Sequence, residues 1–323
     1  MRKLDGAYTT VVGLAGVAVL FVAAPSLTVA EESLWRQVRI NLVMRERPTL
    51  DVVESANDAV RAAEREHGAE HLAVATPLET LGLLYQSQGR YAEAQQTFER
   101  QLRILEARFG AGHPKVATSR HRLGLLAHLQ GRDEEAERLL RQALAMRQVE
   151  LGPYDGDVAE SLIDLGIFYD LQQRMEEAGM LLERGVAVRE RHKSTAPLEY
   201  AKALNALASH AYLQQRYADA VPLTEQALAI DQRELGVDSS EAAADLTNLG
   251  VLQEHVGHYE QAEQLYRQAM AIWESALGED RPASVPPPGL QSPVMQRVRP
   301  AGLVEDAAAS SMPASSGTSQ RRP

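Results

Sequence analysis

The chain has 323 residues and a formal net charge of −11 at pH 7, with 45% hydrophobic and 24% charged residues. This composition is ordinary for a folded protein, and the acidic balance argues against a general nucleic-acid binder, which needs clustered Lys and Arg. The absence of cysteine excludes structural disulfides, thiolate metal sites and a cysteine nucleophile.

The first 30 residues have the layout of an export signal. Arg2 and Lys3 precede an uncharged apolar run, Val11–Ala24, and small residues end the segment at Ala30. This layout predicts a secretory signal peptide cleaved after Ala30. The alternative is an uncleaved anchor, because residues 11–30 carry no charge and about 20 apolar residues can span a bilayer. Either interpretation predicts an exported chain that is periplasmic, secreted or held at the membrane only through this segment.

Residues 31–70 are predicted to form a degenerate first unit of a repeat. They hold two segments of helical composition, SLWRQVRINLVMRE and LDVVESANDAVRAAEREHG, joined at Arg47–Pro48. The two segments lie one period ahead of the repeats that follow. Ile40 and Val52 stand where the later units have Gly or Ala, as expected for an atypical terminal cap.

One short stretch recurs five times at a constant spacing of 42 residues, without insertion or deletion. The copies are LGLLYQSQGRYAEA, LGLLAHLQGRDEEA, LGIFYDLQQRMEEA, LASHAYLQQRYADA and LGVLQEHVGHYEQA, beginning at Leu81, Leu123, Leu165, Leu207 and Leu249. A fixed period of this size indicates one supersecondary unit that is stacked several times. We place the units within residues 71–282, at about 71–114, 115–156, 157–198, 199–240 and 241–282.

Each unit has two helical segments separated by a turn, and each segment carries a column of small residues. The columns are Gly82, Gly124, Gly166, Ala208 and Gly250 on the first helices, and Ala94, Ala136, Ala178, Ala220 and Ala262 on the second. Gly inside a helix costs about 1 kcal/mol relative to Ala, so we expect a close approach of the two helices there. Larger residues one turn beyond each Ala are expected to fill space toward the next unit: Phe98, Leu140, Leu182, Thr224 and Tyr266.

The pattern resembles the tetratricopeptide repeat in the 42-residue form of kinesin light chain-like proteins. The matching features are the two small columns, the leucine that begins each stretch, and a linker seen best as FGAGHP at residues 109–114. The resemblance implies an all-α fold, an α-solenoid in which helix-turn-helix units form a right-handed superhelix. It also implies a concave groove, lined by the first helices, that binds a protein or an extended peptide.

Family positions transferred to this chain imply a peptide-binding groove formed by Arg122, Leu125, His128, Asp164, Ile167, Asp170, Lys202, Asn205, Tyr212, Asn248 and Val251. Further inward positions are Thr76, Glu79, Leu83, Gln86, Thr118, His121, Glu160, Ser209, Thr247 and Glu254. Asn205 and Asn248 match asparagines that hold the ligand backbone in kinesin light chain-like repeats. The charges of the second and third units predict a ligand with an acid beside Arg122 and a base beside Asp164 and Asp170.

No catalytic motif stands out: there is no Gly-rich phosphate loop, no GxSxG and no HExxH. The pairs His67–His71 and His255–His258 straddle glycine turns, and a zinc site needs three or four converging ligands. The sequence therefore predicts no enzyme activity, no metal site and no cofactor. The leading hypothesis is an exported scaffold or adaptor. The alternatives are a structural or tethering component of an envelope-associated enzyme complex, contacting partners through the solenoid ends, and a catalytic protein with accessory repeats.

Residues 283–323 are rich in Pro, Ser, Ala and Gly, which predicts a disordered tail. Only Leu303–Ser310 is compatible with a short helix. The preceding helix carries Leu265, Met270, Ile272 and Trp273 with no further unit to cover them. Exposed apolar patches usually mark contact sites, so this end is predicted to meet a partner or a second copy of the chain.

Overall fold

The computed structural model describes Val11–Val12, Ala18–Val19 and residues 50–277, and from residue 50 onward this part of the chain is almost entirely helical. The helices are α2 (Leu50–His67), the 3₁₀ turn η1 (Leu72–Val74), α3 (Ala75–Ser87), α4 (Tyr91–Phe109), α5 (Pro114–Leu129), α6 (Asp133–Glu150), α7 (Gly156–Leu171), α8 (Met175–Arg191), α9 (Pro197–Leu213), α10 (Tyr217–Leu235), α11 (Ser240–Val256) and α12 (Tyr259–Leu277). The predicted all-α solenoid is confirmed.

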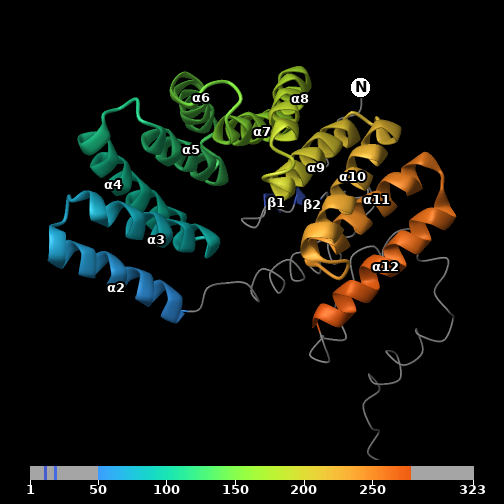
Figure 1. The fold of residues 1–323 in the computed structure, drawn as a ribbon, viewed down its shortest axis with the longest axis horizontal. Coiled ribbons are helices and arrows are strands. Elements are labelled where there is room, and N and C mark those ends of the chain that lie inside the picture. The colour runs from blue at the N-terminus through green and yellow to red at the C-terminus, as the bar shows by residue number, and fades with distance from the viewer. Residues whose placement is uncertain (1–10, 13–17, 20–49, 278–323) are drawn as a thin grey trace, which may run out of the picture.

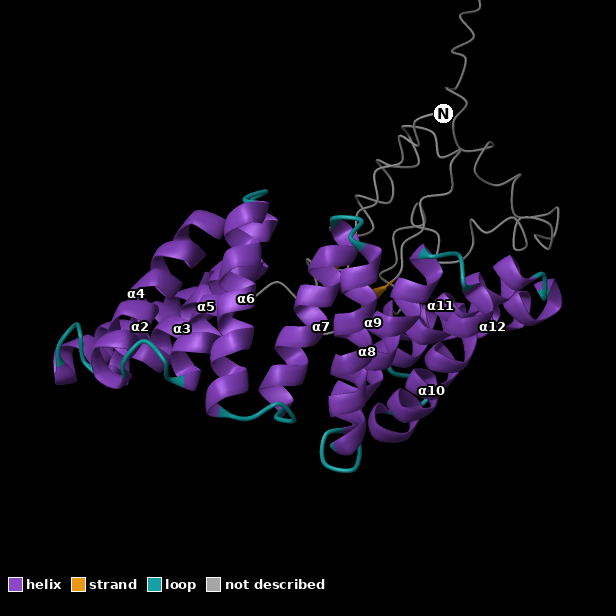
Figure 2. Cartoon of the chain, turned by 90° about the horizontal axis from the view of Figure 1, so that it is seen from above, coloured by secondary structure: helices purple, strands orange, loops and turns teal. Residues whose placement is uncertain are grey.

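The helices pair into five units, α3–α4, α5–α6, α7–α8, α9–α10 and α11–α12, which we number one to five. The units follow one another along an arc, with α2 packed on α3 at its start (Figure 1). Figure 2 shows from above that each unit adjoins only its neighbours. This nearest-neighbour stacking is what allows a single period to repeat along the whole chain.

Two short strands lie near the inside of the arc. β1 (Val11–Val12) and β2 (Ala18–Val19) pair antiparallel, with Val11 opposite Val19, and β2 lies beside α9 and α11 (Figure 1). The rest of the predicted signal segment, the first helix of the predicted cap and the predicted tail at 283–323 lie outside the described residues. Within the described part, no helix combines the length and the apolar character that crossing a membrane requires.

The small column on the first helices receives the large side chain of the second helix of the same unit. A Cβ atom built on Gly82 would lie 2.5 Å from the Phe98 ring, and one on Gly166 would lie 2.7 Å from Leu182 Cγ. Such distances leave no room for a side chain. The expected close approach is therefore present, and the large residues fill the space above the glycine of their own unit. Phe98 also packs with Leu123 of the next unit, and Leu182 with Ala203, as the sequence predicted.

Unit four combines a larger residue on the first helix with a smaller residue on the second helix. It has Ala208 where the other units have Gly, and the facing residue is Thr224, which is smaller than Phe98 or Leu182. Both residues are buried, at 1% exposure each, and the Thr224 hydroxyl donates to the carbonyl of Ala220 at 3.2 Å. The extra methyl group on the first helix is thus offset by a shorter side chain on the second.

The turn between the helices of each unit requires a left-handed backbone. Gly89 and Gly131 have φ of 74°, and Gly257 has φ of 93°. Units three and four place Gln173 and Gln215 there, with φ of 60°. A side chain in this conformation costs roughly 1–2 kcal/mol, so these two turns are less stable locally than the glycine turns.

In units one to four, the residue after the turn is an arginine that pairs with an acid in the first turn of the second helix. Arg90 pairs with Glu93 and Arg132 with Glu135, while Arg174 Nη2 lies 2.6 Å from Glu177 Oε1. Acidic residues at a helix start also complement the helix dipole. The guanidinium of Arg174 stacks over the Tyr169 ring at 3.9 Å as well, which fixes the angle at which the second helix leaves the turn.

The last helix buries most of the apolar surface that the sequence left without a covering unit. Ile272 is buried with Ala269 against α11, and Leu265 and Trp273 pack half-buried beside them. Met270 packs on Ala262 and Tyr266 of its own helix. The second helix of unit five therefore uses these side chains mainly for its own unit.

The size balance between the two small-column positions can be tested by a double-mutant cycle in unit three. Gly166→Ala should destabilise the protein by about 1–3 kcal/mol, because the new Cβ overlaps Leu182. Adding Leu182→Thr, which recreates the pair found in unit four, should offset part of that loss, with a coupling of about 0.5–3 kcal/mol. Urea unfolding of the wild type, both single variants and the double variant measures the coupling.

Gly112→Ala is the matched control, since a Cβ there would meet only Glu150 Oε1 at 3.8 Å. It should change stability by less than about 0.5 kcal/mol. Strict additivity of Gly166→Ala and Leu182→Thr would show that the two positions do not share one space.

Candidate peptide-binding groove

The first helices α3, α5, α7, α9 and α11 line the inner side of the arc, and an apolar row runs along them. The row consists of Leu83, Leu125, Ile167 and Val251, each directly after the small-column residue of its unit, with Ser209 in unit four. The four apolar side chains are half-buried and pack partly on the unit cores. Each therefore keeps some apolar surface that a ligand can cover.

Polar contacts join each inner helix to the next. Arg122 Nη2 on α5 lies 2.6 Å from Glu79 Oε1 on α3, and His121 Nε2 lies 2.8 Å from Asp164 Oδ2 on α7. Further along, His210 Nδ1 on α9 lies 2.7 Å from Asp170 Oδ1 on α7. The partners stand 40 to 43 residues apart in the chain. We call these contacts, with the α9–α11 contacts described next, the inner polar ladder.

Between α9 and α11 the ladder consists of an amide, a phenol and a buried acid. Asn205 Nδ2 donates to Asp245 Oδ1 at 2.6 Å, and the Tyr212 hydroxyl lies 3.1 Å from His255 Nε2. Asp245 is 1% exposed and its other oxygen has no hydrogen-bond partner. An unpaired buried carboxylate oxygen is costly, so this acid favours its protonated form.

A second acid reinforces that effect. Burial, together with the charge of Asp231, raises the pKa of Asp245 to about 8. Burial and the charge of Glu241 raise the pKa of Asp231, which is 7% exposed, to about 6. The hydrogen bond from Asn205 lowers the pKa of Asp245, and the charge of Lys202 lowers the pKa of Asp231, but both effects are smaller than that of burial. Both carboxyl groups therefore hold their protons to a higher pH than an exposed aspartate does.

The predicted groove residues divide into two groups. The half-buried ones, open to a ligand, are Arg122, Leu125, His128, Asp164, Ile167, Lys202 and Val251. The buried ones are Asp170, Asn205, Tyr212 and Asn248, with exposures of 3% to 9%. β2 lies beside α9 and α11, the helices that carry three of these four.

The predicted charge polarity of a ligand needs correction. Arg122 is matched by Glu79, His128 Nδ1 lies 2.7 Å from Asp133 Oδ1, and Asp170 is matched by His210. Because these groups are satisfied within the chain, they do not call for an acid and a base on the ligand. Asn205 likewise binds Asp245 instead of being held ready for a ligand backbone.

Two kinds of buried polar residue were not predicted from the sequence. One kind lies on the second helices, and the other lies at positions where the other units have small residues. Arg147, 2% exposed, donates to the carbonyl of Asp157, to Glu160 and to Ser161, and so joins units two and three. A readable signal existed for Asp245, which occupies the position held by Pro77, Ser119, Ser161 and Ala203 in the other units. A charged residue among small ones at a repeat position marks a buried interaction.

Two cavities in the described part have volumes of about 150 and 180 Å³. One of about 150 Å³ lies between α3, α4 and α5, lined in part by Thr76, Glu79, Gln101 and Lys115. Pockets for small molecules typically measure about 300–1,000 Å³. The inner surface therefore suits an extended chain laid over it better than an enclosed small molecule.

Comparisons with known proteins agree with this architecture. The tetratricopeptide repeat family model matches residues 53–107, 74–148, 116–191 and 199–275, more than half of the chain. BtubC (BKLC) from P. vanneervenii has a similar fold, with a TM-score of 0.60 and 20% sequence identity over 71% of this chain and 92% of that one.

A second solved structure, the putative kinesin light chain nearly identical TPR-like repeats of Podosopora anserina, is similar with a TM-score of 0.54. Its sequence is 25% identical, and the match covers 64% of this chain and 98% of that chain. No curated protein matches the sequence.

The acid pair predicts a specific dependence of stability on pH. Asp245 and Asp231 hold protons in the folded state above their ordinary pKa of 3.8, whereas the unfolded chain has already released them. Their contribution to stability is therefore complete below about pH 4 and is lost as pH rises toward about 8. Asp245→Asn keeps a neutral partner for Asn205 and should reduce this loss by more than about 1 kcal/mol.

Urea unfolding of both proteins at pH 5 and pH 8 measures the difference. Asp238→Asn, at an exposed position in the linker before α11, is the control and should keep the wild-type pH dependence. An equal loss of stability between pH 5 and pH 8 in wild type and Asp245→Asn would contradict the raised pKa of Asp245.

Proposed function

Because the chain belongs to the tetratricopeptide repeat family, whose members generally mediate protein–protein interactions, we propose that it is a non-catalytic scaffold that holds an extended protein segment along the apolar row of its inner surface. The observation that carries this proposal is the row itself, Leu83, Leu125, Ile167 and Val251, half-buried at one position of four units. A ligand side chain can bury apolar area at each step of the period.

The surroundings of the row determine what kind of segment suits it. The charged groups beside it are paired within the chain at 2.6 to 2.8 Å, and charged groups that already have partners add little to affinity. Ligand specificity then comes from apolar side chains that match the row. The half-buried Ser209 hydroxyl donates to the carbonyl of Asn205, and its oxygen can accept a hydrogen bond from a ligand backbone N–H. Self-association through unit five stays a prediction of the sequence.

We also propose that the protein is exported. The support is the order of basic residues, apolar run and small residues in the first 30 positions. The mass of C-terminally tagged protein recovered from an expression host tests this. A chain beginning at Glu31 would support cleavage, a full-length chain in the membrane fraction would support the anchor, and a full-length chain in the cytosol would contradict both.

The groove is tested with peptides selected from a random display library against the purified protein. Selected peptides should be rich in apolar residues, and Leu125→Glu should weaken their binding at least about tenfold, because it places a charge where apolar area is buried. Fluorescence anisotropy with labelled peptides measures the affinities.

Val149→Glu provides the control, since Val149 lies near the end of α6 and is 79% exposed. It should leave peptide affinity unchanged. Peptides that bind the wild type and Leu125→Glu equally well would place the ligand away from the apolar row.

A further inference from the structure

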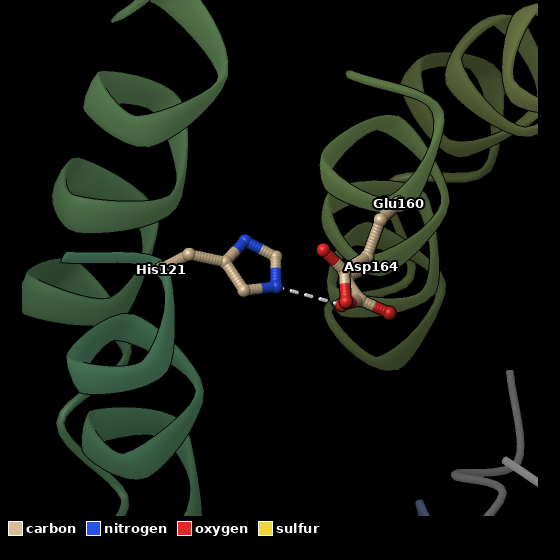
Figure 3. Close-up of side chains that lie close together, drawn as sticks. All are labelled: His121, Glu160 and Asp164. Atoms are coloured by element: carbon tan, nitrogen blue, oxygen red, sulfur yellow. Dashed lines mark hydrogen bonds and ion pairs between the residues drawn. The ribbon is translucent and has the colours of Figure 1, made fainter. Parts of the chain in front are cut away.

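Three potential metal ligands converge at the junction of units two and three. His121 lies on α5, while Glu160 and Asp164 lie on α7 (Figure 3). One nitrogen or oxygen atom of each residue lies within 4.8 Å of those of the other two. Glu160 and Asp164 are four residues apart, so their carboxylates project from the same face of α7. No other group of three such ligands occurs among the described residues.

The histidine is held in place and directed at the two acids. His121 is 3% exposed, and its ring points from α5 across the helix junction toward Asp164 and Glu160 (Figure 3). Its Nε2 atom lies 2.8 Å from Asp164 Oδ2, and its buried Nδ1 atom has no hydrogen-bond partner. The only polar partner of this buried ring is therefore a member of the cluster.

Glu160 is the movable member. Its side chain is 48% exposed, and its Oε2 atom lies 3.0 Å from Arg147 Nη1. Arg147 also donates to the carbonyl of Asp157 at 2.9 Å and to Ser161 Oγ at 2.7 Å. Arg147 keeps these two neutral acceptors if Glu160 turns toward His121, but it loses its carboxylate partner, so the movement of Glu160 costs part of that ion pair.

We propose that His121, Glu160 and Asp164 bind a divalent transition-metal ion of the zinc type, bridging units two and three. One imidazole nitrogen and two carboxylates suit Zn²⁺ or Co²⁺ better than Mg²⁺ or Ca²⁺, which prefer oxygen ligands alone. Zinc holds such ligands at about 2.0–2.2 Å, so Glu160 must move inward and the His121–Asp164 hydrogen bond must be replaced by bonds to the ion. Water completes the coordination from the open inner surface.

Two features predict a moderate affinity for the metal ion. Ligating histidines usually donate their second ring N–H to a partner, and loss of that partner weakens metal binding by about 10–100-fold. His121 Nδ1 lacks one, and Arg147 competes for Glu160. The ion is therefore bound reversibly, unlike a structural zinc that is required for folding.

Other histidines of the chain provide matched controls. His128 pairs with Asp133 at 2.7 Å in the same way that His121 pairs with Asp164, but no third ligand completes that pair. His67 and His71 stack with ring centroids 5.1 Å apart and represent an adventitious surface site. A metal that merely binds histidines would not distinguish these positions from His121.

The experiment titrates zinc chloride calorimetrically into the full chain after treatment with EDTA. We expect one ion per chain and at least about tenfold weaker binding in both Glu160→Gln and Asp164→Asn. The affinity should be unchanged in His128→Asn and His67→Asn. Glu160 is half-exposed, so Glu160→Gln should fold normally, and circular dichroism of every variant checks this.

Cobalt serves as a second readout. Co²⁺ bound by one nitrogen and two carboxylates should give visible absorption that Glu160→Gln abolishes and His128→Asn retains. Absence of saturable zinc binding by the folded wild type would overturn the proposal. So would binding that is unchanged in Glu160→Gln and Asp164→Asn, because the ion would then sit elsewhere. Neither result would bear on peptide binding along the apolar row.

Discussion

The whole stack depends on the contact between a large side chain of each second helix and the bare backbone of the first helix. Phe98 over Gly82 and Leu182 over Gly166 leave no space for a Cβ atom, so the large side chain packs directly on the backbone of the first helix. The contact fixes how the helices of one unit cross, and every unit consequently presents the same two faces to its neighbours. One added residue in either helix would rotate its partner away, which accounts for a period of 42 residues without interruption.

Contacts between units have a different chemical character. Apolar residues fill the space between units, but polar pairs determine how the inner helices align: Arg122 with Glu79, His121 with Asp164 and Asp170 with His210. Hydrogen bonds are directional, whereas apolar packing tolerates sliding. The inner polar ladder therefore specifies the curvature of the arc, and it leaves the apolar row as the part of the inner surface with free capacity for a partner.

The sequence predicted the fold well because the information is repeated. Small residues at two fixed positions in five units identify the helix pair, and one atypical residue such as Ala208 does not obscure the pattern. The sequence placed the large residues toward the next unit but did not show that Phe98 and Leu182 also cover the glycine of their own unit. Each second helix is apolar on two sides, and periodicity alone does not say which side meets which neighbour. Long-range pairs were harder still, since nothing local to Asp170 indicates that His210 pairs with it.

Part of the candidate groove was nevertheless predicted from the sequence. Leu125, Ile167 and Val251 were placed on the inner surface by the resemblance to the family, and the structure leaves them half-buried there. The cluster of His121, Glu160 and Asp164 was missed because His121 belongs to unit two and the two acids to unit three. Only the spacing of one period plus one residue between His121 and Asp164 connects the two units. In repeat proteins, residues one period apart are neighbours in space, so a search for complementary pairs at that spacing would have found the ladder.

The position of the His121–Asp164 contact has a mechanical consequence. Each unit contacts only the units beside it, so changes in the angle between successive units add along the arc. A small rotation at an end junction moves one unit, but the same rotation between units two and three carries α2 to α6 on one side relative to α7 to α12 on the other. This junction therefore has the greatest leverage over the distance between the two ends of the solenoid, and a single side-chain contact there can set how widely the arc opens.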